Sequence, residues 1–274
     1  MLNQTLLTCH KFSRYSDKMT TQTQEKTYII AGINGDIGLT FARRFEGLGK
    51  LYGISRKLDK LEDLVYEHVQ CDLLKLTDVN EMFESINLSG DLTYIHLPGK
   101  FQFQDENHPI TDSNNDGIDD DIFATNVETF RNVMPHLFAY LKRNGDARLK
   151  IIAIGSTSDL YDISYWHSFT HSKNELRKHF RFMYGTPETY GRVSSLFINV
   201  STTDGEQLAG ERPHISKVFV LQPSEILDQA FPHIVSTRTE FLEISILKPN
   251  PDFACENYLD NSEIKKRWYK DMYG

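Results

Sequence analysis

The sequence predicts an α/β fold in which a doubly wound parallel sheet of about seven strands carries helices on both faces. Short runs rich in apolar residues alternate with amphipathic helical patterns along the chain. A glycine-rich turn directly follows the first apolar run, and neither a linker nor an internal repeat divides the 274 residues. A chain of this length is within reach of one large domain with a sizeable core.

The composition excludes several classes of function. Hydrophobic residues make up 39% of the chain and charged residues 25%, which is ordinary for a globular protein. The formal net charge of -8 argues against nucleic-acid binding, and no apolar stretch reaches the roughly 18 to 20 residues of a membrane span. Cys9, Cys71 and Cys255 have neither metal-ligand nor disulfide spacing. We therefore expect a cytoplasmic protein with no metal site and no membrane partner.

Three segments are expected along the chain. The first 26 residues are polar and lack the apolar segment of a secretory signal, so they predict a disordered tail. Residues 27–250 predict the single domain, and residues 251–274 a C-terminal extension. In that extension Ile264, Trp268 and Met272 recur at helical spacing. They predict an amphipathic helix that docks on the body of the chain or on a second subunit, and a homo-dimer or homo-tetramer is among the expected states.

Apolar periodicity gives the order of the elements. The expected strands are Tyr28–Ala31, Leu51–Ile54, His68–Cys71, Leu92–Leu97, Leu149–Ile154, Ser194–Val200 and Leu242–Leu247. The expected helices are the segment from the glycine turn to Phe45, Leu61–Tyr66, Thr77–Ser85, a long helix carrying Ile122 to Leu137, Ser172–Phe182 and Ser224–Ile234. Strands that alternate with helices in this way predict a parallel sheet covered on both faces.

The first strand runs into a loop with the spacing G-x-x-G-x-x-G, formed by Gly32, Gly35 and Gly38 with Asn34 and Ile37 between them. Glycine is needed where such a chain turns tightly, where its backbone meets a pyrophosphate, and where the helix packs on the strand. The helix that follows offers free N–H groups to phosphates. The position between a first strand and a first helix is the context that this motif requires. It predicts a Rossmann-type dinucleotide-binding core, with a plain glycine turn as the alternative.

The second strand ends in Ser55, Arg56 and Lys57. A cofactor with a free ribose 2′-hydroxyl favours an acidic residue near this position, whereas a 2′-phosphate favours Arg, whose planar fork binds two oxygens. Ser55 and Arg56 therefore favour NADP(H) over NAD(H). A solvated basic pair is the alternative.

Further motifs follow in a recognisable order. They are Cys71-Asp72-Leu73 after the third strand, His96-Leu97-Pro98-Gly99 after the fourth, Asn126-Val127 in the long helix, Ile151–Ser156 in the fifth strand, and Leu221–Ile226 with Phe241–Pro249 near the end. Together with the glycine loop they resemble the short-chain dehydrogenase/reductase family over roughly residues 26 to 250. The resemblance is loose residue by residue but correct in order and spacing.

The resemblance implies roles for particular residues. In the family a serine polarises the substrate carbonyl, a tyrosine transfers the proton, a lysine lowers the tyrosine pKa and holds the ribose, and an asparagine orders a water. Ser156, Lys173 and Asn126 occupy the corresponding positions here. By the same resemblance, Asp72 with Leu73 would contact the adenine. Gly99 would then lie in the turn beside the cofactor.

The tyrosine position departs from the family. It lies thirteen residues after Ser156 and four before Lys173, and it holds Phe169. Phenylalanine has no proton to give, and acid–base transfer by a positioned side chain is typically worth about 10²–10⁴ in rate. Tyr165 or His167 could take the role of proton donor, or both could simply line a pocket.

A second departure points in the same direction. The family's Pro-Gly after the sixth strand is replaced here by Ser201-Thr202-Thr203-Asp204. We expect an atypical NADP(H)-dependent oxidoreductase of a biosynthetic pathway that acts on a small-molecule substrate, for example an activated alkene. A non-catalytic binding or regulatory protein and a non-redox dehydratase or isomerase are the alternatives, because the fold alone does not fix the reaction.

An acidic loop between residues 112 and 121 matches the front half of a calcium-binding EF-hand loop. Asp112, Asn114, Asp116 and Gly117 fall at the required spacing, but Phe123 stands where a bidentate glutamate is needed. The alternative, a solvated acidic loop that leads into a helix start, is therefore preferred.

Overall fold

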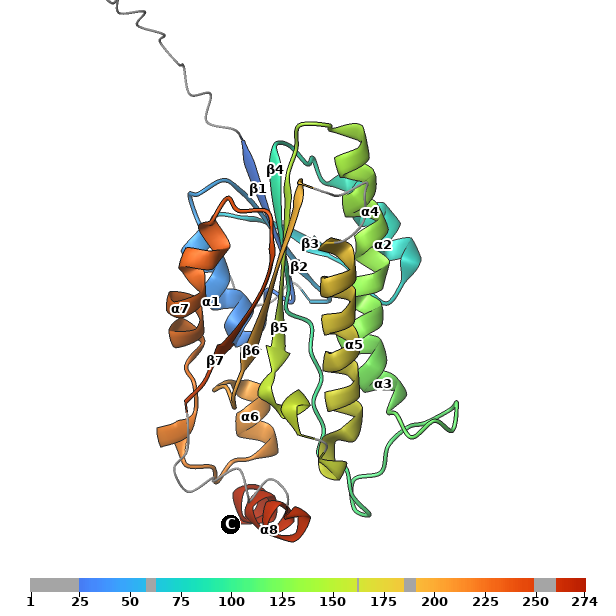
Figure 1. Ribbon diagram of the computed structural model, residues 1–274, viewed down its shortest axis with the longest axis vertical. Helices are drawn as coiled ribbons and strands as arrows, with labels where there is room; N and C mark the ends of the chain where they lie inside the picture. The colour runs from blue at the N-terminus through green and yellow to red at the C-terminus, as the bar shows by residue number, and fades with distance from the viewer. Residues whose placement is uncertain (1–24, 58–62, 162, 185–190, 249–259) are drawn as a thin grey trace, which may run out of the picture.

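The computed structural model describes residues 25–57, 63–161, 163–184, 191–248 and 260–274. Within these residues, seven parallel strands form one sheet in the order β3-β2-β1-β4-β5-β6-β7 (Figure 1). The strands are β1 (Lys26–Ala31), β2 (Lys50–Ser55), β3 (Glu67–Gln70), β4 (Asp91–His96), β5 (Leu149–Ser156), β6 (Val193–Val200) and β7 (Phe241–Ile246). The predicted fold class is confirmed.

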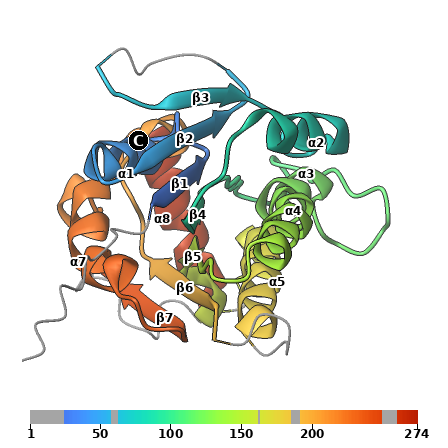
Figure 2. The ribbon, with the colours of Figure 1, turned by 90° about the horizontal axis from the view of Figure 1, so that it is seen from above.

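Helices cover both faces of the sheet, as Figure 2 shows. One face carries α1 (Asp36–Phe45) and α7 (Pro223–Val235), and the other carries α2 (Leu76–Ser85), α4 (Thr129–Arg143) and α5 (His167–Tyr184). The shorter elements are α3 (Asp120–Phe123), the π-turn η1 (Ala124–Glu128), η2 (Thr157–Leu160), η3 (Ser164–Trp166), α6 (Glu206–Glu211) and η4 (Lys217–Phe219). The last helix is α8 (Asn261–Tyr273).

The apolar runs form strands because both faces of the sheet are buried. In β1, Ile29 and Ala31 belong to the core on the α4 and α5 side, whereas Tyr28 and Ile30 belong to the core on the α1 and α7 side. Ile29, Ile30 and Ala31 have no exposed surface. A parallel sheet covered in this way requires continuous apolar strands rather than an apolar–polar alternation.

The strand order reverses between β1 and β4. Ala31, near the end of β1, pairs with Ile54 of β2 on one side and with His96 of β4 on the other. Because all seven strands are parallel, their carboxyl ends meet at one edge, and the reversal opens a crevice there. In Figure 1 this edge faces α6 and α8. Any ligand site of this fold is expected at that edge.

Several predicted elements differ from the structure. Asp63–Tyr66 forms a turn, a bend and irregular chain instead of the end of the predicted helix Leu61–Tyr66, whose first residues lie outside the described residues. Helix α5 begins at His167, five residues before the predicted start at Ser172. The short helix α6 was not predicted, because six residues are too few to show a period.

The two ends of the chain bear on the predicted segments. Of the expected N-terminal tail only Glu25 and Lys26 are described, and Lys26 already belongs to β1; the rest of that prediction lies outside the described residues. At the other end, α8 packs on its own chain with Ile264 fully buried. Among the described helices, none combines the length and apolarity that a membrane span requires.

Candidate functional site

The glycine loop lies between β1 and α1 and needs glycine at two positions for different reasons. Gly32 has φ +79°, in the left-handed region. A Cβ on Gly38 would lie 2.3 Å from the carbonyl oxygen of Gly32, so only glycine lets α1 pack this closely on the loop. Gly35 precedes α1 in an extended conformation and supplies no side-chain cap. The first amides of α1 therefore have no side-chain partner at Gly35, which is the arrangement of a phosphate-binding helix start.

Asp36, the first residue of α1, places a carboxylate at this helix start. Its Oδ2 accepts a hydrogen bond of 2.9 Å from the backbone N–H of Glu206, at the start of α6. A Cβ on Gly205 would lie 2.4 Å from the same oxygen, so the two segments approach closely. The sequence motif treats this position as variable and gave no sign of the contact.

The end of β2 is tied to the glycine loop by backbone carbonyls. Asn34 Nδ2 donates to the carbonyl of Lys57 at 2.6 Å, and Ser55 Oγ donates to the same carbonyl at 2.5 Å. Ser55 Oγ also lies 2.8 Å from Nε2 of His68. Burial lowers the pKa of His68 below its ordinary value. The Arg56 side chain is exposed beside this turn.

The predicted adenine-contacting pair after β3 divides into two environments. Leu73 is 6% exposed and belongs to the core on the α4 side, and its carbonyl accepts from Asn132 Nδ2 at 2.9 Å. Asp72 is half-buried and its Oδ1 accepts from the backbone N–H of Leu74 at 3.2 Å. Leu73 thus packs its side chain inward, and Asp72 presents the polar group of the pair.

The turn after β4 brings the glycine loop and the buried lysine together. A Cβ on Gly32 would lie 3.1 Å from the backbone nitrogen of Pro98, so the loop and the turn are in contact. A Cβ on the exposed Gly99 would lie 3.7 Å from Lys173 Nζ and 3.8 Å from Asn126 Oδ1. Three predicted site positions, Gly99, Asn126 and Lys173, therefore converge at the carboxyl edge of the sheet.

The ammonium of Lys173 is buried. The residue is 5% exposed, and Nζ donates to the carbonyl of Ile154 at 3.0 Å. Burial lowers the pKa of Lys173 to about 8, although the nearby Asp159 carboxylate acts in the opposite direction. A buried amine with one carbonyl partner is expected to hold a polar ligand group strongly.

Asn126 holds a break in the long helix. It lies in the π-turn η1 between α3 and α4 and has no exposed surface. Its Oδ1 accepts from the backbone N–H of Lys100 at 2.7 Å, while Nδ2 donates to the Lys100 carbonyl at 3.0 Å and to Ser172 Oγ at 2.8 Å. These bonds use both hydrogens of the amide. Asn126 therefore fixes the helix turn, the Lys100 backbone and α5, and a single turn of π-helix is often found at functional sites.

Ser156 ends β5 and caps the turn that follows. Its Oγ accepts from the backbone N–H of Ser158 at 3.1 Å and from Ser158 Oγ at 2.9 Å. The serine is half-buried at the same edge of the sheet as Lys173, whose carbonyl partner Ile154 lies two residues earlier in β5.

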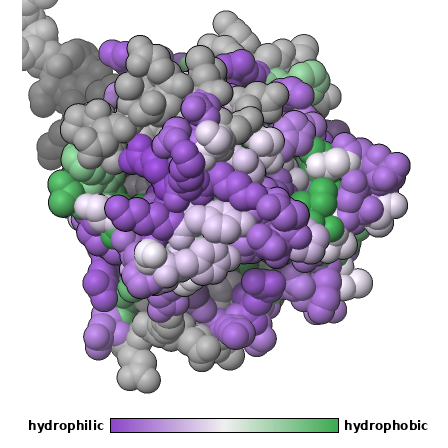
Figure 3. Space-filling model, turned by 90° about the horizontal axis from the view of Figure 1, so that it is seen from below, coloured by the Kyte–Doolittle hydropathy of each residue, from purple (hydrophilic) through white to green (hydrophobic). Residues whose placement is uncertain are grey.

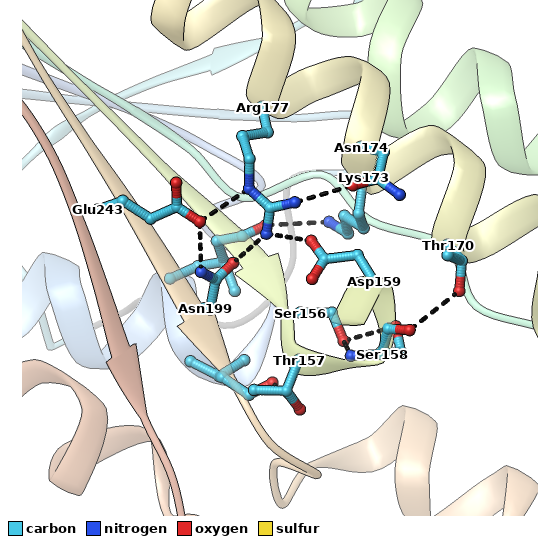
Figure 4. A network of polar contacts seen from close by, with 12 residues as sticks. Ser156, Thr157, Ser158, Asp159, Thr170, Lys173, Asn174, Arg177, Asn199 and Glu243 are labelled. Atoms are coloured by element: carbon cyan, nitrogen blue, oxygen red, sulfur yellow. Dashed lines mark hydrogen bonds and ion pairs between the residues drawn. The ribbon is translucent and has the colours of Figure 1, made fainter. Parts of the chain in front are cut away.

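Beside Lys173 lies a buried ionic network that the sequence did not indicate (Figure 4). Arg177 forms ion pairs with Asp159 and, at 2.8 Å through Nε, with Glu243 of β7. Arg177 Nη2 also donates to Asn199 Oδ1 at 3.0 Å. The Asp159 side chain has no exposed surface, and burial raises its pKa despite the neighbouring positive charges. The network joins the turn after Ser156 to α5, β6 and β7.

The tyrosine position of the family holds Phe169 in α5, where the ring is half-buried. The Phe101 ring meets it edge-on at a centroid distance of 5.0 Å. Of the two predicted substitutes, Tyr165 stacks on Phe103 at 5.1 Å within the same aromatic cluster, whereas His167 is exposed. The structure therefore brings Tyr165, but not His167, into the ring cluster around Phe169.

The acidic loop is closed on itself. Asp112 accepts from the backbone N–H groups of Asp116 at 3.1 Å and Gly117 at 2.7 Å, and Asn115 adopts φ +58°. Among the described residues, no group of three or more His, Cys, Asp or Glu side chains is arranged to hold a metal ion. The Asp112 carboxylate caps the turn, as in the solvated-loop interpretation.

The fold of this chain is similar to the folds of several solved structures. A short-chain dehydrogenase from Streptomyces avermitilis matches with a TM-score of 0.65 and 12% identity, over 89% of this chain and 94% of that chain. An actinorhodin polyketide ketoreductase variant with NADPH matches with a TM-score of 0.65 and 16% identity, over 82% of this chain and 97% of that chain. A 4-hydroxyisoleucine dehydrogenase complexed with NADH matches with a TM-score of 0.61 and 17% identity, over 81% of this chain and 97% of that chain. No family model and no curated protein matches the sequence.

Proposed function

We propose that this chain, whose fold is that of the short-chain dehydrogenases/reductases, is an atypical oxidoreductase that binds NADP(H) in preference to NAD(H). The proposed substrate is a small molecule of a biosynthetic pathway. One observation carries the proposal: a buried ammonium, Lys173, lies beside the exposed backbone of Gly99, and the same turn contacts Gly32 of the glycine loop. A cofactor that reaches from the loop to the lysine would cross the crevice where the strand order reverses.

The residues present fit a nicotinamide dinucleotide. The loop packs so closely that a Cβ on Gly38 would meet the carbonyl of Gly32, and α1 starts at this point with its amides facing the loop edge. Arg56, exposed at the end of β2, would bind a ribose 2′-phosphate. Asp72 would contact the adenine, and Lys173 would hold the nicotinamide ribose. When bound, the nicotinamide supplies or accepts a hydride.

The chain's own groups suit a restricted reaction. Both hydrogen bonds at Ser156 Oγ are accepted by the serine oxygen, so its own proton is available to polarise a substrate oxygen. Phe169 supplies no proton, so simple ketone–alcohol interconversion should be slow. An activated alkene needs its proton on carbon, which water or Tyr165 would deliver. Asn126 contributes by holding the π-turn and α5 in register.

A second candidate function is cofactor binding without catalysis. The observation that favours it is the Phe169 ring, which fills the tyrosine position with carbon and packs against Phe101. A sensor or a partner of an active enzyme would need the glycine loop and Lys173 but no proton donor. It would bind NADPH but would not oxidise it, whatever substrate is offered.

Direct titration tests the proposal. NADPH and NADH are added separately to the protein, and binding is followed by the enhancement of nicotinamide fluorescence. We expect NADPH to bind more tightly, and Arg56→Ala to weaken NADPH about tenfold while leaving NADH unchanged, since a charge-assisted bond to phosphate is lost. Arg238→Ala, at another exposed arginine before β7, is the control. Failure of both cofactors to bind contradicts both candidate functions.

A further inference from the structure

Four charged side chains, two of each sign, lie together beside the proposed reaction site (Figure 4). They are Lys173, Arg177, Asp159 and Glu243. The Asp159 side chain has no exposed surface, and the most accessible of the four, Glu243, is 24% exposed. A buried ion pair is weak evidence for stability, because apolar side chains of similar volume often serve as well. The set is therefore a candidate for a role in the site.

The surface at this end of the molecule offers solvated positions for charged groups. Figure 3 shows the molecule from the end where the parallel strands finish, and hydrophilic side chains cover most of that face. Lys173 and Asp159 lie inside instead, where a charge needs a specific partner. The question is then which group compensates which.

Two cations act on Asp159. It belongs to η2, three residues after Ser156, and forms an ion pair with Arg177. Apart from that guanidinium, neither oxygen of its carboxylate has a hydrogen-bond donor among the residues that the structure describes. The positive charge of Lys173 also acts on the carboxylate. The negative charge of Asp159 is therefore compensated by Arg177 and Lys173.

Helix α5 carries both cations on one face. Lys173 and Arg177 are four residues apart, which places them one turn from each other. In Figure 4 the Asp159 carboxylate lies on the Lys173 side of the Arg177 guanidinium, and Glu243 lies on the opposite side. Glu243 also pairs with the exposed Arg181 at 3.0 Å. Asp159 therefore belongs with Lys173, whereas Glu243 belongs to the β7 side of the network.

A further titratable group near Lys173 is His96 of β4. His96 is 1% exposed, and burial, with a smaller effect of the Lys173 charge, lowers the pKa of His96 to about 3. The imidazole is therefore uncharged at neutral pH and does not compensate the lysine. Arg177 has the same sign as Lys173, and Phe169 offers only its ring. Of the carboxylates that the structure describes, Asp159 is the one whose charge supports the Lys173 ammonium.

We propose that Asp159 is a positioning residue of the proposed reaction site: it is the buried counter-ion that keeps Lys173 as an ammonium for the cofactor. Arg177 holds the Asp159 carboxylate in place through their ion pair. An ammonium donates stronger hydrogen bonds to ribose and phosphate oxygens than a neutral amine does. Because Phe169 supplies no hydroxyl to share a proton with the lysine, the charge of Lys173 depends on Asp159. This role rests on the proposed function, since Lys173 is a site residue only if it holds the cofactor.

A double-mutant cycle tests the counter-ion without any ligand. Urea unfolding is measured over the neutral and alkaline range for four full-length proteins: the parent, Lys173→Met, Asp159→Asn and the double variant. The measured quantity is the difference in the free energy of unfolding between the lysine and the methionine protein of each pair. With Asp159 present, this difference should begin to rise with pH at about 8, where the folded protein loses the Lys173 proton and the unfolded chain still holds it.

In the Asp159→Asn pair the rise should begin about one pH unit lower, because no opposite charge then favours the ammonium. Glu243→Gln, with and without Lys173→Met, is the matched control. It removes a carboxylate that pairs with the same Arg177, so it should lower stability but leave the onset near pH 8. If Asp159→Asn is too unstable to titrate, all proteins are compared in trimethylamine N-oxide, which stabilises folded states in general.

An onset that Asp159→Asn does not move overturns the proposal, because a purely structural role lowers stability equally at every pH. An equal shift in the Glu243→Gln pair overturns it as well. NADPH titration of the parent and of Asp159→Asn over the same range should show affinity falling with pH, from about one pH unit lower in the variant. A moved onset without NADPH binding contradicts the proposed function alone, whereas NADPH binding with an unmoved onset contradicts the role of Asp159 alone.

Discussion

The ammonium of Lys173 lies 5.5 Å from the centroid of the Phe169 ring, one turn away along α5. A cation over an aromatic face is attracted by the ring quadrupole, so the ring stabilises the charge that burial disfavours. By the resemblance to the short-chain dehydrogenase/reductase family, the lysine would assist a tyrosine hydroxyl at this position. Phe169 has no hydroxyl, so the spacing is kept and that group is missing.

Phe169→Tyr should restore that hydroxyl. If the rest of the site is competent, we expect NADPH-dependent reduction of a simple aromatic ketone to rise at least about 10²-fold, the lower end of what a positioned acid contributes. The measurement is NADPH oxidation at saturating cofactor. His171→Tyr, at an exposed position two residues further along α5, is the control and should give no gain. No gain in either variant, with NADPH still bound, would favour the non-catalytic candidate.

Lys173→Met should change how stability depends on pH. The folded protein holds the Lys173 pKa at about 8, below its ordinary 10.5. Below pH 8 the lysine is charged in both states, and the burial penalty is constant. Between pH 8 and 10.5 the unfolded chain binds more protons at Lys173 than the folded protein does. The contribution of Lys173 to the free energy of unfolding therefore rises with pH over this range.

Urea unfolding of the parent and of Lys173→Met at a series of pH values measures this contribution. We expect the stability of the parent relative to the variant to be flat below pH 8 and to increase toward pH 10.5. The pKa of Lys150 is also lowered to about 8 by burial, but this lysine is present in both proteins and cancels in the difference. A difference that does not vary with pH would show that the folded state does not perturb Lys173.

Asp36→Asn should strengthen NADPH binding. The Asp36 carboxylate lies at the start of α1, where the phosphates are proposed to bind, and like charges repel there. Removing the charge should tighten NADPH about two- to fivefold, the usual size of a charge effect at a helix end. Asp116→Asn makes the same change in the remote acidic loop and should have no effect. Equal or weaker binding by Asp36→Asn would place the phosphates away from this helix start.

Arg177→Met should destabilise the fold strongly. It leaves Asp159 and Glu243 without their buried partner, and breaking such a pair typically costs about 3–5 kcal/mol. Arg181→Met is a matched control, because Arg181 pairs with the same Glu243 but its side chain is 60% exposed. That variant should lose at most about 1 kcal/mol. Chemical denaturation of both variants measures the contrast, and equal losses would show that burial is not what strengthens the Arg177 pairs.

Most of the sheet could be predicted from the sequence because its strands are buried on both faces. All seven expected strands occur within two residues of their predicted bounds, since a run such as Tyr28–Ala31 has no other stable environment. The predicted helix Leu61–Tyr66 was wrong over its described part. Apolar residues at helical spacing can also form a turn when tertiary contacts favour it. Here the Tyr66 ring packs so closely on Gly53 that a Cβ at that position would lie 2.8 Å from the ring.

The site residues could be predicted from the sequence only where fixed intervals along the chain place them. Ser156, Phe169 and Lys173 were found because fixed intervals along β5 and α5 place them, and the structure brings Lys173 to Asn126 and Gly99. Contacts between distant segments leave no such interval. The place where the Trp268 ring packs depends on where α8 docks, and no pattern in residues 251–274 predicts that position.

The Arg177 network also constrains how this sequence can diverge. Three ionised side chains from η2, α5 and β7 share one buried space, so their effects on stability are not additive. Loss of the arginine alone leaves the buried Asp159 carboxylate without its ion-pair partner and Glu243 with the exposed Arg181, and loss of either carboxylate alone leaves excess positive charge beside Lys173. Substitutions at Asp159, Arg177 and Glu243 are therefore tolerated best together, and these positions should change as a set among relatives that keep the buried lysine.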